Sequence, residues 1–436
     1  MIPNDPLYKD QWHLHVLEME KVWDIELGSA EVLVAVVEAG FDVEHPDLVN
    51  RIQRTIDLSD HPDTMSADGR SEAESMTDHG THMLGLIGAE MNNDEGGVGV
   101  APGCKLLPVK ITNASDDDHI AAGIRAAIDE GARVINLSNV AYYQLGKEGI
   151  TILPRQSGPP RTDNLLEACR YAVSHNVLIS SIVAGNQGFF SITWPAAYHP
   201  GLNVIQGDVE GTGPANFCAI NEYADVLAPG GDRAPSGDAD WPWGDHPDPA
   251  RGLMSTVQVK NGSYRYWSGG CMSTAVASGV AALMYSRFSD LTVEQARQVI
   301  CNTAKGDGWT RETGHGYINP LGIMTLERVE CDLEITDFAF DGKDVSVTIA
   351  NRGVLDARDL LVLLYCEEPD TPKTRQVAHK PLPLVRGMES AGTTFEDVAL
   401  LPGTEELWVV IDTKRQLSAA QRDAGVYSLR ECVGVG

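Results

Sequence analysis

Short, continuous apolar segments alternate with helical patterns along most of the chain, and this alternation is the feature that most constrains the fold. The apolar segments lie at residues 32–37, 105–111, 133–137, 177–183 and 203–206. Segments of this length without polar alternation are typical of parallel strands that are buried on both faces. Helical patterns lie between and after them, at residues 81–91, 118–131, 163–175, 272–288 and 293–304. We therefore predict an α/β fold built on a doubly wound, mainly parallel sheet.

The pattern changes near residue 330. From there, short β-type segments (VSVTIA, LLVLLY and ELWVVI) are separated by turn residues, which is typical of a small antiparallel β-sandwich. We predict two domains, residues 1–330 and an Ig-like β-sandwich at residues 331–436. Three long segments are expected to be loops, at residues 58–77, 139–161 and 231–251. They would be either binding loops or plain surface insertions.

Composition excludes several classes of function. Hydrophobic residues make up 43% of the chain, as in a globular protein, and the net charge of −29 argues against nucleic acid or an anionic membrane as partner. One interpretation of this charge is that it keeps the protein soluble or adapts it to salty conditions. The alternative is that the negative field attracts a basic substrate. The eight scattered cysteines form no C-x-x-C pair, which argues against a zinc site. No apolar run is long enough to span a membrane, and the polar start lacks a signal segment. We expect a cytoplasmic protein, or a secreted one if a leader was removed, and we predict no oligomeric state.

Four segments carry residues suited to acyl transfer. Residues 38–40 end a predicted strand, 78–82 open a predicted helix, 184–186 follow a strand, and 269–272 open an apolar helix. Because ligands bind at the carboxyl ends of parallel strands, these segments are expected to converge. A cysteine at a helix start favours thiolate, a histidine accepts a proton, a carboxylate orients that histidine, and an asparagine amide stabilises an oxyanion. Each residue taken alone also has a plain structural interpretation.

Taken together, these segments resemble the motifs of the subtilases. VAVVEAGFDVEHPDL, DHGTHMLGLIGA, AGNQG and SGGCMSTAVASGVAAL are similar, in order, to the family's aspartate, histidine, oxyanion asparagine and serine motifs. The resemblance spans about Asn4 to Leu326 and implies the subtilisin fold and peptidase activity on a peptide or protein substrate. It implies that Cys271 is the nucleophile, His79 the base, Glu38 the residue that orients His79, and Asn186 an oxyanion donor.

Two departures from the family affect the chemistry: Glu38 replaces its aspartate and Cys271 its serine. Neighbouring departures, such as Gly270, favour natural divergence over a single designed substitution. A thiolate is a better leaving group than an amine, so amide cleavage should be slower than with serine. Three hypotheses stay open: a Cys-dependent peptidase working through a thioester, a peptide ligase or macrocyclase using the same thioester, and a catalytically silent peptide-binding protein. Retention of His79 and Asn186 favours an enzyme, with cleavage ahead of ligation.

The resemblance also implies binding residues. An extended substrate would pair with the chain at Ser138, Asn139, Val140, Ala184 and Gly185. The segment MNNDEGGVGVAP resembles a calcium loop of the family. Structural Ca²⁺ would be held by oxygens of Asp5, Asp47, Met91, Asn93, Glu95 and Gly97. The alternative is an ordinary acidic turn. We expect no organic cofactor. The C-terminal region resembles adhesion-type modules and would serve either interaction or support of the core.

Overall fold

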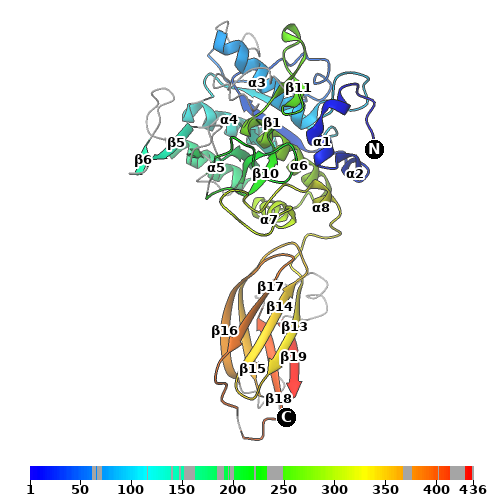
Figure 1. The fold of residues 1–436 in the computed structure, drawn as a ribbon. Coiled ribbons are helices and arrows are strands. Elements are labelled where there is room, and N and C mark those ends of the chain that lie inside the picture. The colour runs from blue at the N-terminus through cyan, green and yellow to red at the C-terminus, as the bar shows by residue number, and fades with distance from the viewer. Residues whose placement is uncertain are drawn as a thin grey trace. The chain divides into compact units, whose positions relative to one another are not determined.

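The chain is described by a computed structural model (Figure 1). It covers residues 1–60, 65, 71–114, 116–138, 141–146, 149–151, 163–183, 191–194, 196, 201–219, 222–232, 249–366, 376–400, 402–412 and 428–434. The chain divides into two compact units, Met1–Thr325 and Leu326–Gly436. Each unit has its own buried apolar cluster, as expected of a separate domain.

A seven-stranded parallel sheet forms the centre of the first unit, in the order β10-β9-β7-β4-β1-β3-β2. Its strands are β1 (Leu33–Glu38), β2 (Ile56–Asp57), β3 (Lys105–Lys110), β4 (Val134–Leu137), β7 (Leu178–Ile182), β9 (Leu202–Gly207) and β10 (Val226–Pro229). Every residue of β1 is buried, because helices cover both faces of the sheet. The predicted doubly wound sheet is confirmed.

The direction of the β1 side chains decides which face of the sheet carries Glu38. Leu33, Ala35 and Val37 belong to the apolar cluster shared with helices α4 (Asp117–Asp129) and α5 (Asp163–Ser174). Because side chains alternate along a strand, Glu38 points to the opposite face. Helices α3 (Ser71–Gly88) and α6 (Gly270–Arg287) contact β1 and each other. They therefore bring their side chains toward Glu38.

Short elements complete the first unit. They are η1 (Tyr8–Asp10), α1 (Trp12–Val16), α2 (Met19–Trp23), β11 (Leu253–Thr256), η2 (Val259–Asn261), β12 (Tyr264–Trp267), α7 (Val293–Thr303) and α8 (Pro320–Met324). Strands β11 and β12 form an antiparallel hairpin. Helix α7 begins with a capping box between Thr292 and Gln295.

Two loop predictions were wrong. Helix α3 begins at Ser71 and ends at Gly88, whereas residues 58–77 were predicted as loop and the helix as 81–91. Residues 71–75 contain the good helix formers Glu and Ala but little apolar periodicity, so the pattern missed them. His79 consequently lies inside α3 and does not open it. The predicted loop 139–161 contains β5 (Ala141–Gly146) and β6 (Gly149–Thr151), which form an antiparallel sheet with β8 (Ser191–Trp194).

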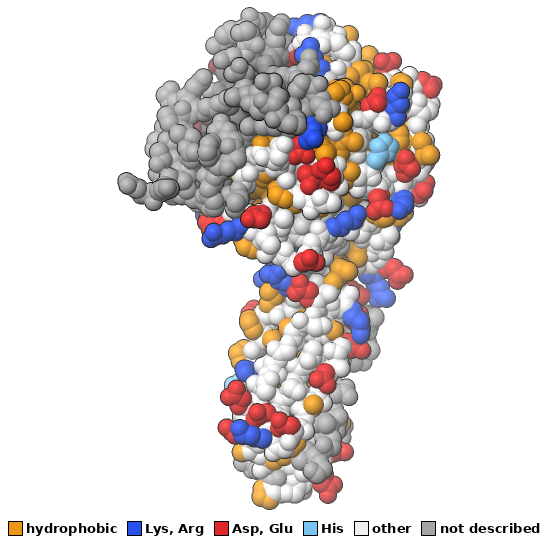
Figure 2. All heavy atoms as spheres, in the orientation of Figure 1, with side chains coloured by type: hydrophobic (Ala, Val, Ile, Leu, Met, Phe, Trp, Pro, Cys, Tyr) orange, Lys and Arg blue, Asp and Glu red, His pale blue; other side chains and the backbone are white. Residues whose placement is uncertain are grey.

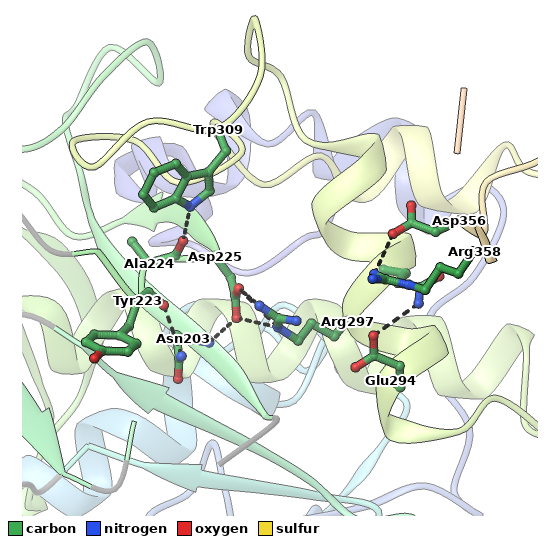
Figure 3. Close-up of polar contacts among 10 residues, drawn as sticks. Asn203, Tyr223, Ala224, Asp225, Glu294, Arg297, Trp309, Asp356 and Arg358 are labelled. Atoms are coloured by element: carbon green, nitrogen blue, oxygen red, sulfur yellow. Dashed lines mark hydrogen bonds and ion pairs between the residues drawn. The ribbon is translucent and has the colours of Figure 1, made fainter. Parts of the chain in front are cut away.

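A buried ion pair joins the edge of the sheet to α7 (Figure 3). Asp225, which directly precedes β10, is buried and accepts a hydrogen bond from Arg297 Nε at 3.0 Å. The backbone N–H of Asn203, in β9, donates to the same carboxylate oxygen at 2.9 Å. A buried carboxylate needs such partners, because leaving it unpaired would cost several kcal/mol. The pair therefore holds β9, β10 and α7 together.

The second unit is an antiparallel β-sandwich. One sheet has the order β13-β14-β17 and the other β16-β15-β18-β19. The strands are β13 (Leu333–Phe340), β14 (Val345–Asn351), β15 (Ala357–Tyr365), β16 (Gln376–Val385), β17 (Ser390–Phe395), β18 (Glu406–Asp412) and β19 (Ser428–Gly434). Alternate residues of β14, β15 and β18 form its apolar cluster, as the sandwich prediction requires.

Charge is dispersed over the face of the molecule drawn in Figure 2, where acidic and basic side chains are interspersed. The excess of acidic residues therefore does not gather into one patch on that face. Among the residues that the structure describes, no helix is long and apolar enough to cross a membrane.

Candidate active site

Glu38 lies at the carboxyl end of β1, completely buried. Its Oε1 accepts a hydrogen bond from the backbone N–H of Ala39 at 2.8 Å. Its Oε2 lies 2.7 Å from Nδ1 of His79, in α3, so the imidazole donates to the carboxylate. This contact needs a close approach of the two elements at Gly80. A Cβ there would lie 2.2 Å from the carbonyl oxygen of Gly40, so no larger residue fits without a backbone shift.

The β11–β12 hairpin holds α3 from the other side. The carboxylate of Asp78 accepts hydrogen bonds from the backbone and side chain of Gln258, both at 2.9 Å, and from Asn261 Nδ2 at 2.8 Å. Thr256 Oγ1 donates to the carbonyl of Thr81 at 2.7 Å. These bonds bracket His79 and fix its position along the helix. Asp78 and the hairpin were not predicted as part of the site, although Asn261-Gly262 is a recognisable turn signal.

Cys271 lies in the first turn of α6, with 1% of its surface exposed. Its Sγ is 3.4 Å from the carbonyl oxygen of Ser138, the residue that follows β4. The Ser138 hydroxyl donates to the Cys271 carbonyl at 3.3 Å and accepts from Asn136 Nδ2 at 2.9 Å. The positive end of the helix dipole favours a negative charge on this sulfur. The end of β4 and the start of α6 are thus held together at the nucleophile.

The electrostatics of His79 favour an ion pair. Burial acts to lower the pKa of its imidazole, but the Glu38 carboxylate and the negative sulfur of Cys271 raise it to about 10. Hydrogen bonding of the imidazole with both side chains acts in the same direction. Nδ1 is the nitrogen bonded to Glu38, and Nε2 is buried. The imidazole of His79 is therefore placed to hold a proton beside the Glu38 carboxylate.

Comparison with known proteins places this arrangement in a family. A sequence model described as the Subtilase family matches residues 29–316. The chain belongs to the subtilase family. Fervidolysin of Fervidobacterium pennivorans is 28% identical to this subtilase over 334 residues, which cover 72% of this chain and 43% of that protein. Thermitase of Thermoactinomyces vulgaris is 28% identical over 324 residues, covering 72% of this chain and 98% of that one.

Solved structures share the fold. A protease from Pseudoalteromonas arctica matches this subtilase with a TM-score of 0.61 and 23% identity, covering 74% of this chain and 99% of that chain. The nisin leader peptidase NisP from Lactococcus lactis matches with a TM-score of 0.58 and 20% identity, covering 74% and 95%. At these identities the likeness shows the fold of this subtilase and does not indicate its substrate.

The structure explains the glycine that precedes Cys271. A Cβ at Gly270 would lie 2.2 Å from Cδ1 of Ile182 and 2.7 Å from Nε2 of Gln206. Both of those side chains are completely buried. They fill the space that a larger side chain would need at this position, so the departure at Gly270 is matched by its surroundings.

Not every predicted site residue can be placed. Glu38, His79, Cys271 and Ser138 are brought together as described above. Five other predicted residues lie outside the described residues: Asn139, Val140, Ala184, Gly185 and Asn186.

The predicted calcium loop encloses two buried carboxylates. Asp5 and Asp47 are 4% and 0% exposed, and Asn93 Nδ2 donates to Asp47 Oδ1 at 2.9 Å. The backbone N–H of Asn92 donates to Asp5 at 2.9 Å. Burial, followed by the charge of Asp5, raises the pKa of Asp47 to about 7, although hydrogen bonds from Asn93 and Gly97 oppose this. Burial likewise raises the pKa of Asp5.

The residues of this loop fit a calcium ion better than a softer metal. Within the described part of the chain, no cluster of three or more His, Cys, Asp or Glu side chains could hold a metal. The loop instead combines two carboxylates with an amide side chain and the backbone of Met91, Glu95 and Gly97. Oxygen donors of this kind suit Ca²⁺, and a cation beside two buried carboxylates would offset their mutual repulsion.

Proposed function

We propose that this subtilase cleaves peptide bonds through a thioester on Cys271, assisted by His79 and Glu38. One observation carries the proposal: the Glu38 carboxylate lies 2.7 Å from Nδ1 of His79, where it and Cys271 raise the pKa of the imidazole. A thiolate paired with an imidazolium is already activated for attack. The imidazolium is then available as a general acid.

The side chains have defined roles in each step. The Cys271 thiolate attacks the carbonyl carbon, a C–S bond forms, and the oxygen takes the negative charge. His79 gives its proton to the amide nitrogen, the C–N bond breaks, and the amine leaves. Water then attacks the thioester while His79 takes one of its protons; the C–S bond breaks and the thiolate returns. Glu38 keeps the imidazole oriented and stabilises its charge.

Oxyanion stabilisation is assigned to the start of α6. The backbone N–H of Cys271 belongs to the first turn of this helix, whose N–H groups lack intrahelical acceptors. The sequence predicts Asn186 as the second donor. Removing one such donor typically costs about 3 kcal/mol in the transition state.

Mass spectrometry of a diverse peptide pool tests the proposal. The pool is incubated with the wild type, with Cys271→Ala and with Cys271→Ser. We expect cleaved products with the wild type that vanish with Cys271→Ala, and a peptide adduct on Cys271 that hydroxylamine releases. If peptides are instead joined, the result would favour ligation over hydrolysis. An unchanged pool in every sample, without an adduct, would contradict peptidase activity and favour a silent peptide-binding protein.

We also infer that the loop at residues 91–97 holds a structural calcium ion with Asp5 and Asp47. Two buried carboxylates with raised pKa support this proposal. The ion would lie in a part of the fold distinct from the catalytic residues and would take no part in the reaction. Its contribution would be to stability, by binding the folded chain alone.

A further inference from the structure

One indole ring covers two histidines of α3. His79 and His82 are three residues apart, so they lie on the same face of the helix. The ring of Trp267 is stacked on both: its centroid is 4.8 Å from that of His82, with 13° between the planes, and 6.2 Å from that of His79, with 26°. Trp267 ends β12, with two residues between it and the start of α6, and is 3% exposed. It therefore links the element that carries the nucleophile to the catalytic imidazole.

The position of Trp267 depends on these stacks. Its Nε1 is buried and has no hydrogen-bond partner among the residues that the structure describes. A buried tryptophan N–H usually finds a partner, so this ring is held by packing alone at some cost. His82 provides an anchor: its Nε2 lies 3.3 Å from the carbonyl of Arg265, in the same strand as Trp267. Burial lowers the pKa of His82 to about 3, so its ring stays neutral.

Within the part of the chain that the structure describes, four elements carry groups near His79. Glu38 lies on β1, Cys271 on α6, His82 on α3 itself and Trp267 on β12. The nearby carboxylate of Asp78 is engaged by Gln258 and Asn261. Of these residues, Glu38 is bonded to Nδ1 and Trp267 is stacked on the ring face.

We propose that Trp267 is a positioning residue for His79. It fixes the plane of the imidazole so that Nδ1 faces Glu38, and its π face stabilises the imidazolium. The inference rests on the proposed function because it concerns the same ion pair. It adds a residue that the catalytic motifs do not contain.

Histidine titration by NMR tests this inference without any substrate. Histidine is labelled with ¹³C, and the ring signal of His79 is assigned by its loss in His79→Gln. In Trp267→Leu, which keeps apolar bulk but loses the aromatic face, we expect the midpoint of this signal to fall by about one pH unit. In Trp267→Phe, which keeps a weaker aromatic face, we expect a smaller fall. Trp309→Leu, at a residue 39% exposed, should leave the midpoint unchanged.

Each outcome decides the inference. A midpoint that is the same in the wild type and in Trp267→Leu would reduce Trp267 to a packing residue. If Trp267→Leu does not fold, Trp267→Phe decides, and an unmoved midpoint there overturns the proposal. Peptide turnover is measured in parallel. A shifted midpoint in a protein that never cleaves peptides would refute the proposed function and keep the positioning role.

Discussion

At the scale of single residues, the unusual acid of this subtilase is accommodated by its neighbours. Glu38 is one methylene longer than aspartate, yet it lies 2.7 Å from His79. The backbone N–H of Ala39 holds its other oxygen, which fixes the plane of the carboxylate. A Cβ at Gly80 would lie 2.9 Å from Cγ of Glu38, so this glycine leaves room for the longer side chain. Glutamate can thus perform the orienting role here.

Removing the charge of Glu38 should impair the ion pair. In Glu38→Gln we expect the pKa of His79 to fall, because the carboxylate is the first group that raises it toward about 10. Peptide cleavage should fall by roughly 100- to 10,000-fold, since an amide favours the wrong tautomer. The measurement is kcat/KM against pH. Glu38→Asp keeps the charge and should lose less; equal losses in both variants would contradict the role assigned to the charge.

The same pKa predicts how stability depends on pH. His79 has a folded-state pKa raised to about 10. Its contribution to stability is therefore fully present below the ordinary histidine pKa, about 6.5, and is lost as the pH rises toward the folded value. In Glu38→Gln, stability should fall less as the pH rises from about 6.5 toward about 10. Urea unfolding at a series of pH values in this range measures the difference.

At the scale of elements, sequence reasoning succeeded where burial was complete. Strands β1, β3 and β7 were found because both of their faces are buried, which leaves an unbroken apolar run. The start of α3 was missed because its first turns lack apolar periodicity. The β11–β12 hairpin was missed because β12 is only partly buried, so its residues are mixed in character. Glu38, His79 and Cys271 could be predicted from motifs, but the contributions of Asp78 and Trp267 depend on tertiary contacts between distant segments.

The loop at residues 91–97 should respond to calcium. Adding Ca²⁺ after chelation should raise the melting temperature of the wild type but not that of Asp47→Asn.

In the calcium-free protein, the raised pKa of Asp47 makes stability depend on pH in the opposite direction to a carboxylate in a salt bridge. The folded chain keeps a proton that the unfolded chain releases, so stability should fall as the pH rises from about 4 to about 7. An equal response to calcium in both proteins would place the ion elsewhere.

At the scale of the whole molecule, the two units have separate apolar clusters. Local damage should therefore affect only one of them. A Cβ at Gly85 would lie 2.3 Å from Thr256 Oγ1, within the first unit. A Cβ at Gly353 would lie 2.1 Å from the carbonyl of Glu330, within the second.

Calorimetry of alanine variants checks this independence. We expect two unfolding transitions, with Gly85→Ala lowering one and Gly353→Ala the other, each by about 1–3 kcal/mol. Gly213→Ala and Gly392→Ala are matched controls, because their added Cβ atoms would have no contact closer than 3.4 Å and 3.5 Å. A single transition that both clashing variants shift together would show one cooperative unit.

The filled space beside Gly270 also limits how this chain could change over generations. Exchanging Cys271 for serine takes one substitution and would restore the family's nucleophile. Placing any larger residue at position 270 would first require Ile182 and Gln206 to move or become smaller, since both side chains occupy that space. Such substitutions would therefore have to occur in a particular order. A lineage that has acquired this interior is partly committed to it, whichever nucleophile it carries.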